Sequence, residues 1–88
     1  MKEIKIKIYE YSPENGFQFS WEDGFMIKTD IHLNPKEIII TANKEGLISL
    51  AQHLLTLAQD NFLKGEHFHL DEFNSLEPNS IELIIEKG

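Results

Sequence analysis

The sequence contains no cysteine and no arginine, and each absence excludes a class of function. Without cysteine, the 88 residues hold no disulfide framework, no thiol nucleophile and no thiolate site for zinc or an iron–sulfur cluster. All eight basic residues are lysines and stand against 15 acids, which gives a formal net charge of −7. Affinity for nucleic acid comes from cationic side chains on phosphates, and arginine is the usual bidentate donor. This composition argues against a nucleic-acid partner.

Long apolar runs are missing as well. A run such as residues 38–40 is three residues long, far below the roughly 18 that a transmembrane helix needs. The chain begins directly with alternating polar and apolar residues, which is not the pattern of a signal peptide. We therefore expect a cytoplasmic protein with no membrane partner. At 10.2 kDa it has room for one hydrophobic core, so we predict a single domain over residues 1–88.

The negative charge is concentrated in the second half of the chain. Residues 1–44 carry six lysines and seven acids, a net of −1, whereas residues 45–88 carry two lysines and eight acids, a net of −6. Such an imbalance concerns partners and electrostatic steering rather than the fold. Solubility explains it equally well, because a net charge of roughly 2–8 suits a small domain.

Four segments in the first half have the sequence character of β-strands. In three of them apolar and polar residues alternate with the period of two that marks a half-buried strand, and the fourth is β-branched throughout. Gly, Pro, Asn and Asp separate them and favour tight turns. The four predicted strands are residues 3–9, 17–21, 25–33 and 38–41.

The middle of the chain predicts one amphipathic helix, with Asn43 as a suitable N-cap and Gly65 as a suitable stop. Leu and Ala recur at steps of three and four residues from Leu47 to Phe62, so we expect this broad apolar stripe to lie flat on a sheet. Gly46 should weaken the first turn by about 1 kcal/mol relative to Ala. The predicted solvent face is polar and nearly uncharged: Ser49, Gln52, His53, Thr56 and Gln59.

Two more predicted strands, residues 67–71 and 81–86, close the chain around a loop at residues 72–80. The element order is then β-β-β-β-α-β-β. We predict an α+β fold, with a largely antiparallel sheet of about six strands and one amphipathic helix packed on one face.

The run His-Phe-His-Leu-Asp at residues 67–71 is a cluster of metal-ligand types. Strand geometry places His67, His69 and Asp71 on one face, and two imidazoles with a carboxylate suit a metal site that keeps a position open for water. On a straight strand, however, the three spread over roughly 13 Å. A fourth ligand would have to come from elsewhere: His32, Asp30 or Glu82. The alternatives are the polar outer face of a strand and a proton- or partner-sensing role, because histidine titrates near pH 6.5.

Other chemistry has no support in the sequence. There is no glycine-rich phosphate loop, and no serine stands in a nucleophile elbow. Trp21 and the phenylalanines are typical of a core, because a base-stacking platform normally lies in a positively charged groove. We therefore expect no enzymatic activity and no cofactor.

Three motifs in the second half resemble a known family. They are the helix sequence Gly-Leu…Leu-Ala…Leu-Leu at residues 46–55, the run His-x-His-Leu-Asp at 67–71, and Glu-Leu-Ile-Ile at 82–85. Together they cover about residues 42–86 and resemble the immunity protein 32 family of bacterial polymorphic toxin systems. The resemblance implies a protein that binds and neutralises a co-encoded toxin inside the producing cell, without catalysis. It carries over no individual site residue.

An acidic protein suits a basic partner, because electrostatic steering speeds association. Many toxins of such systems are nucleases with basic clefts, so the resemblance makes a basic nuclease domain a candidate partner. The predicted partner-binding residues are Glu66, His67, His69, Asp71, Glu72, Phe73 and Glu77, with Phe73 as an apolar anchor. Each of them is otherwise a solvated surface residue. A homo-oligomeric module is a further alternative, suggested by the uncharged helix face and by open sheet edges.

Overall fold

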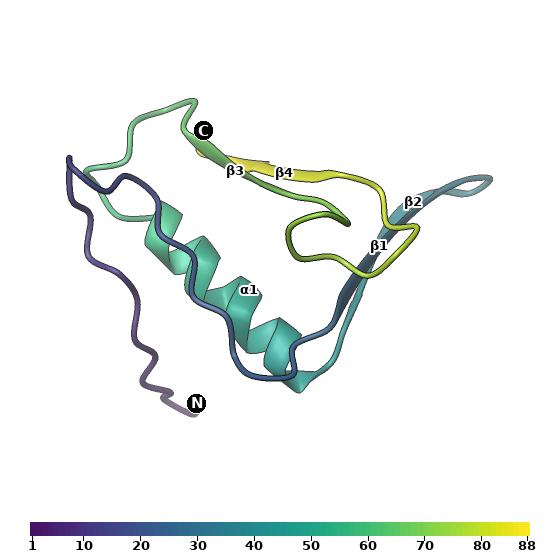
Figure 1. Ribbon diagram of the computed structural model, residues 1–88, viewed down its shortest axis with the longest axis horizontal. Helices are drawn as coiled ribbons and strands as arrows, with labels where there is room; N and C mark the ends of the chain where they lie inside the picture. The colour runs from purple at the N-terminus through teal and green to yellow at the C-terminus, as the bar shows by residue number, and fades with distance from the viewer.

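The computed structural model describes all 88 residues and contains one helix and four strands (Figure 1). In chain order the elements are β1 (Ile27–Leu33), β2 (Lys36–Ala42), α1 (Lys44–Leu57), β3 (His67–Leu70) and β4 (Leu83–Glu86). The predicted α+β class is confirmed, but the prediction of about six strands is wrong because the structure has four. With 14 residues, α1 is neither long enough nor apolar enough to cross a membrane.

The strands form two separate antiparallel ribbons rather than one sheet. β1 pairs with β2, and Ile31 lies opposite Ile38. β3 pairs with β4, and Phe68 lies opposite Ile85. The β1–β2 ribbon extends away from the N-terminal end of α1, and its far half is exposed on both strands (Figure 1).

The loop between β3 and β4 joins the two ribbons. The backbone N–H of Glu77 donates to the carbonyl of Ile27 at 2.9 Å, and the N–H of Ile81 donates to the carbonyl of Thr29 at 3.2 Å. The N–H of Thr29 in turn donates to Ser80 Oγ at 3.2 Å. This loop therefore satisfies the edge of β1 that a third strand would otherwise cover.

Residues 3–9 and 17–21 form no strand, so these two predictions are wrong. Residues 3–8 make no hydrogen bond to any other strand. For residues 11–22 the reason lies in α1, whose side chains supply acceptors that a neighbouring strand would otherwise provide. Three hydrogen bonds hold the segment along the helix: from the N–H of Tyr11 to Gln59 Oε1 (2.9 Å), from Ser20 to His53 Nε2 (3.1 Å), and from Glu22 to Ser49 Oγ (2.9 Å).

Helix α1 is turned the opposite way from the prediction. The face predicted to be exposed is buried: Ser49, Gln52, His53 and Thr56 are at most 7% exposed, and Gln59 is half-buried. Most of the apolar stripe predicted to be buried faces outward: Leu47, Leu54 and Leu55 are 56%, 47% and 46% exposed. At its C-terminal end the prediction is correct, because Leu57 and Phe62 are buried. Buried N–H groups need partners, and the segment that crosses the helix finds them on its polar face. That polar face therefore cannot be the interface of a homo-oligomer.

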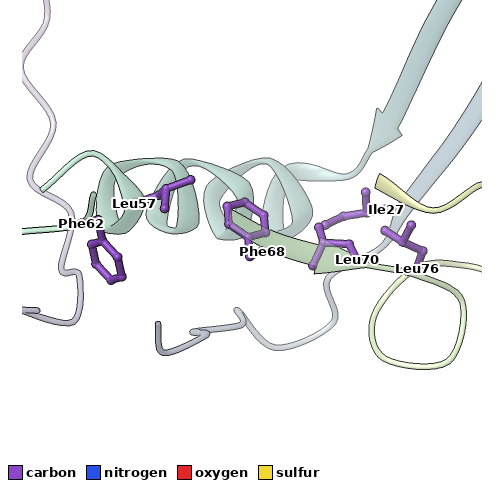
Figure 2. Close-up of a cluster of buried hydrophobic side chains, with 6 residues drawn as sticks. All are labelled: Ile27, Leu57, Phe62, Phe68, Leu70 and Leu76. Atoms are coloured by element: carbon purple, nitrogen blue, oxygen red, sulfur yellow. The ribbon is translucent and has the colours of Figure 1, made fainter. Parts of the chain in front are cut away.

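A small core forms where α1 meets β3 and the start of β1. Its six buried apolar residues are Ile27, Leu57, Phe62, Phe68, Leu70 and Leu76 (Figure 2). Aromatic rings from the unpaired segment extend this core, since Phe17 stacks on Phe68 with ring centroids 4.9 Å apart. The alternation that predicted a strand at residues 17–21 thus marks a segment that packs Phe17 and Trp21 against the core, while Phe19 is 40% exposed.

Asn43 caps α1 and ties the helix to the start of β1. Its Oδ1 accepts from the N–H of Gly46 at 2.8 Å and from the N–H of Met26 at 2.9 Å, while its Nδ2 donates to the carbonyl of Gly24 at 2.9 Å. Asn43→Ala should lower the free energy of unfolding by about 1 kcal/mol, measured by urea titration. Asn43→Asp keeps the acceptor and loses only the donor, so its free energy of unfolding should lie between those of the parent chain and Asn43→Ala. A change below about 0.5 kcal/mol for Asn43→Ala would contradict this role.

Candidate functional site

The loop at residues 71–80 is fixed by its own hydrogen bonds. The Asp71 carboxylate accepts from the N–H groups of Phe73 at 2.8 Å and Asn74 at 3.0 Å. The Asn74 amide oxygen accepts in return from the N–H of Asp71 at 3.0 Å. Beneath the loop, Leu76 is 5% exposed and belongs to the core. The start of the loop therefore has a defined conformation that does not depend on a partner.

This fixed loop presents an aromatic side chain to solvent. Phe73 is 91% exposed, the highest value of any aromatic side chain in the chain. The neighbouring Glu72 is also exposed, and its carboxylate accepts from the N–H of Asn79 at 3.0 Å. An apolar ring on a preformed backbone can enter a partner's pocket without the entropic cost of ordering a loop.

The outward face of β3 carries the two histidines. The ring centroids of His67 and His69 are 4.8 Å apart. His67 Nδ1 lies 3.0 Å from the carbonyl oxygen of Gly65, and His69 Nδ1 lies 3.6 Å from Glu82 Oε1. The Asp71 carboxylate turns instead toward the loop. No group of three or more His, Asp or Glu side chains is arranged to hold a metal ion, so the metal-site alternative is not supported.

The seven predicted partner-binding residues fall into two groups at opposite ends of β3. Glu66 and His67 lie at its start, and Asp71, Glu72, Phe73 and Glu77 follow its end, with His69 between the groups. Four residues of strand separate the groups by roughly 13 Å. Glu77 is half-buried and its N–H pairs with β1, while the Asp71 carboxylate is occupied within the loop. Glu66, Glu72 and Phe73 are exposed.

His53 is a buried titratable group, although the sequence pattern predicts it on the solvent face of the helix. It is 0% exposed, and its ring lies against Trp21 and Phe68 with centroid distances of 4.4 Å and 5.8 Å. Because Nε2 accepts from the N–H of Ser20, the neutral ring carries its proton on Nδ1, which has no hydrogen-bond partner. Burial lowers the pKa of His53 from 6.5 to about 4. The aromatic residues at 17–21 were the one sequence signal for this environment.

The outward face of α1 is an exposed apolar surface that the sequence pattern predicts to be buried. An open groove of about 670 Å³ lies between this helix and the N-terminal residues of the chain. Ile4 and Ile6 line one side of the groove, while Leu47, Ile48 and Ala51 line the other. The sequence signal for this face is Leu and Ala at steps of three and four residues, a pattern that predicts a core-facing stripe.

Comparison with known protein families supports the resemblance carried by residues 42–86. The model of a family described as Immunity protein 32 matches residues 37–88, which is 52 of the 88 residues. The match runs from β2 to the C-terminus and includes the loop at residues 71–80. No curated protein and no solved structure matched the chain. Because the family model covers more than half of the sequence, the chain belongs to the Immunity protein 32 family.

Proposed function

We propose that this chain is a small immunity protein that binds a cognate bacterial toxin inside the producing cell. It neutralises the toxin by steric and electrostatic blocking. Membership of the family supports the general role. The observation that carries the mode of binding is Phe73, 91% exposed on a loop whose backbone is already fixed by Asp71. This role requires no catalysis by the chain and no cofactor, because occupying the toxin's substrate path is sufficient.

The charge distribution supports a basic partner. The net of −6 over residues 45–88 falls entirely within the segment that matches the family. Glu66 and Glu72 are exposed acids at the two ends of β3 and would meet basic side chains around a toxin's cleft. Charges of this kind raise association rates more than they raise affinity, and salt screens them over roughly 10 Å. A basic nuclease domain is the toxin class that fits this chemistry.

The role is tested by expressing this chain together with the toxin domain encoded by the neighbouring gene. Growth should be restored by the chain and by no unrelated acidic protein of similar size. With purified components, the association rate should fall steeply as salt is raised, while the dissociation rate changes little. The proposal is wrong if no toxin gene neighbours this one and the chain protects against none of the toxins tested.

Phe73→Ala should weaken toxin binding at least tenfold, equivalent to about 1.4 kcal/mol, because an apolar anchor at an interface contributes a large share of the affinity. Its own stability should change by less than about 0.5 kcal/mol, since the ring is exposed. The matched control is Leu33→Ala, which removes a side chain 75% exposed at the far end of the β1–β2 ribbon. Titration calorimetry of both variants with the toxin checks the prediction. Equal toxin affinities of the two variants would show that Phe73 does not lie in the interface.

A further inference from the structure

The outward face of α1 is an uncharged surface on a strongly acidic protein. Residues 46–59 contain no Asp, Glu, Lys or Arg, although the whole chain has a net charge of −7. The exposed side chains on this face include Leu47, Leu54, Leu55 and Ala58, and Ile48, Leu50 and Ala51 are half-buried beside them. An apolar surface of this extent normally marks an interaction site. Two copies of the chain repel one another over most of their surface, and they can meet here without bringing acids together.

The spacing along this face is that of a helix-packing seam. Leu47, Ala51, Leu54 and Ala58 are separated by four, three and four residues, the a/d spacing of a coiled coil. The opposite side of the helix packs on the chain's own core and on residues 11–22. Leu47 and Ala51 also line the open groove whose other wall includes residues 4–7, so the N-terminal residues flank one side of the seam and bring Lys5 and Lys7 near it. A second helix can pack along the seam without breaking the hydrogen bonds that hold residues 11–22 on α1.

The seam is complementary to itself when the second helix runs antiparallel. A two-fold axis between residues 52 and 53 places Leu47 against the partner's Ala58, and Ala51 against the partner's Leu54. Every large side chain then faces a small one, as close packing requires. A parallel arrangement would instead set Leu against Leu and Ala against Ala, in alternating crowded and empty layers.

We propose that this chain forms an antiparallel two-fold dimer through the outward face of α1. The occupant of the seam is a second copy of the same chain, selected by the Leu/Ala complementarity and by the absence of charge. The contact is isologous, so it closes as a dimer and does not propagate. The loop at residues 71–80 lies against β1 and not along α1 (Figure 1), so the dimer is independent of the proposed toxin binding.

Light scattering on the purified full chain measures the dimer directly. The mass should rise with concentration from 10.2 kDa to twice that value. Leu54→Glu places a charge in the seam and should give a monomer at every concentration. The control is Leu33→Glu, an equally polar change at a side chain 75% exposed on the β1–β2 ribbon, which should still dimerise. An unmodified chain that stays monomeric at millimolar concentration overturns the proposal, as does a toxin that binds this face of a monomer.

A swap of large and small side chains tests the register. Ala51→Leu and Leu54→Ala should each raise the dissociation constant of the dimer at least tenfold, the first by crowding and the second by leaving a void. The double variant restores a Leu opposite an Ala and should return close to the original affinity. If exposed hydrophobicity alone caused association, Ala51→Leu would strengthen it, and that result overturns the proposed seam. A double variant weaker than both single variants overturns the register.

Disulfide cross-linking can determine whether the two helices run antiparallel. The chain has no cysteine of its own, so an introduced cysteine reports only on its own position. A mixture of Leu47→Cys and Ala58→Cys chains should form a disulfide-linked pair on mild oxidation. Either variant alone should form little, since two copies of residue 47 would be offset by about 16 Å along the helix axis, well beyond the roughly 7 Å limit between bridged Cα atoms. Efficient cross-linking of Leu47→Cys to itself would show a parallel pair and overturn the proposal.

Discussion

Between pH 6.5 and pH 4 this protein should lose about 3 kcal/mol of its free energy of unfolding through one side chain, His53. Burial lowers the pKa of His53 from 6.5 to about 4, because the imidazolium would lie in a site from which water is excluded. The rings that surround it are aromatic, with Phe17, Phe19, Trp21 and Phe68 at centroid distances from 4.4 Å to 6.1 Å. No charged side chain contributes to the change.

The direction of the effect follows from proton binding. In the unfolded chain His53 takes up a proton as the pH falls through 6.5, whereas in the folded chain it stays neutral until about pH 4. Between these values the unfolded state binds more protons, so stability rises with pH. The contribution of neutral His53 is fully present above pH 6.5, declines as the pH falls, and is absent below pH 4.

Urea titrations at pH 7 and pH 5 on the parent chain and on His53→Gln test this effect. Glutamine offers an oxygen to the N–H of Ser20 and does not titrate, so His53→Gln should be less sensitive to pH by about 2 kcal/mol over this interval. The other three histidines are exposed and present in both proteins, so their effects cancel in the comparison. Equal losses of stability in the two proteins between pH 7 and pH 5 would show that His53 is not buried in its neutral form.

The elements that sequence patterns predicted well are those stabilised by local chemistry. All four observed strands overlap predicted ones, and Asn43 begins the helix as predicted, because turn residues and the N-cap act within a few residues of themselves. The loop after β3 was also predicted. Its internal bonds were not, because an Asp71 carboxylate bound to backbone N–H groups has the same sequence as one exposed to solvent.

The predictions that failed concern segments whose structure depends on partners far along the chain. Residues 3–9 and 17–21 alternate like strands, but alternation does not reveal whether another strand is available to pair. Hydrophobic periodicity predicts an apolar stripe on α1 but does not determine whether the stripe faces the core or the solvent. Here Ser49, His53 and Gln59 satisfy the backbone of residues 11–22, and that requirement turns the leucines outward. The same reversal exposes the seam proposed for dimerisation.

At Gly46 the sequence and the structure predict stability changes of opposite sign for the same substitution. On helix propensity alone, Gly46→Ala should stabilise the chain by up to about 1 kcal/mol. In the structure, a Cβ at this position would collide with the carbonyl oxygen of Met26 and would lie 2.9 Å from Ile27 Cγ1. The Met26 backbone cannot retreat, because its carbonyl accepts from the N–H of Asn43 at 3.1 Å and its N–H donates to Asn43 Oδ1.

Gly46→Ala should therefore lower the free energy of unfolding by about 2 kcal/mol, the net of an overpacking cost of about 3 kcal/mol and the gain in helix propensity. Urea titration measures this change, with Lys44→Ala as a control that alters the same turn at an exposed position and should change stability by less than about 0.5 kcal/mol. A more stable Gly46→Ala chain would mean that α1 does not approach β1 this closely. The contacts by which Asn43 positions the helix against β1 would then be wrong as well.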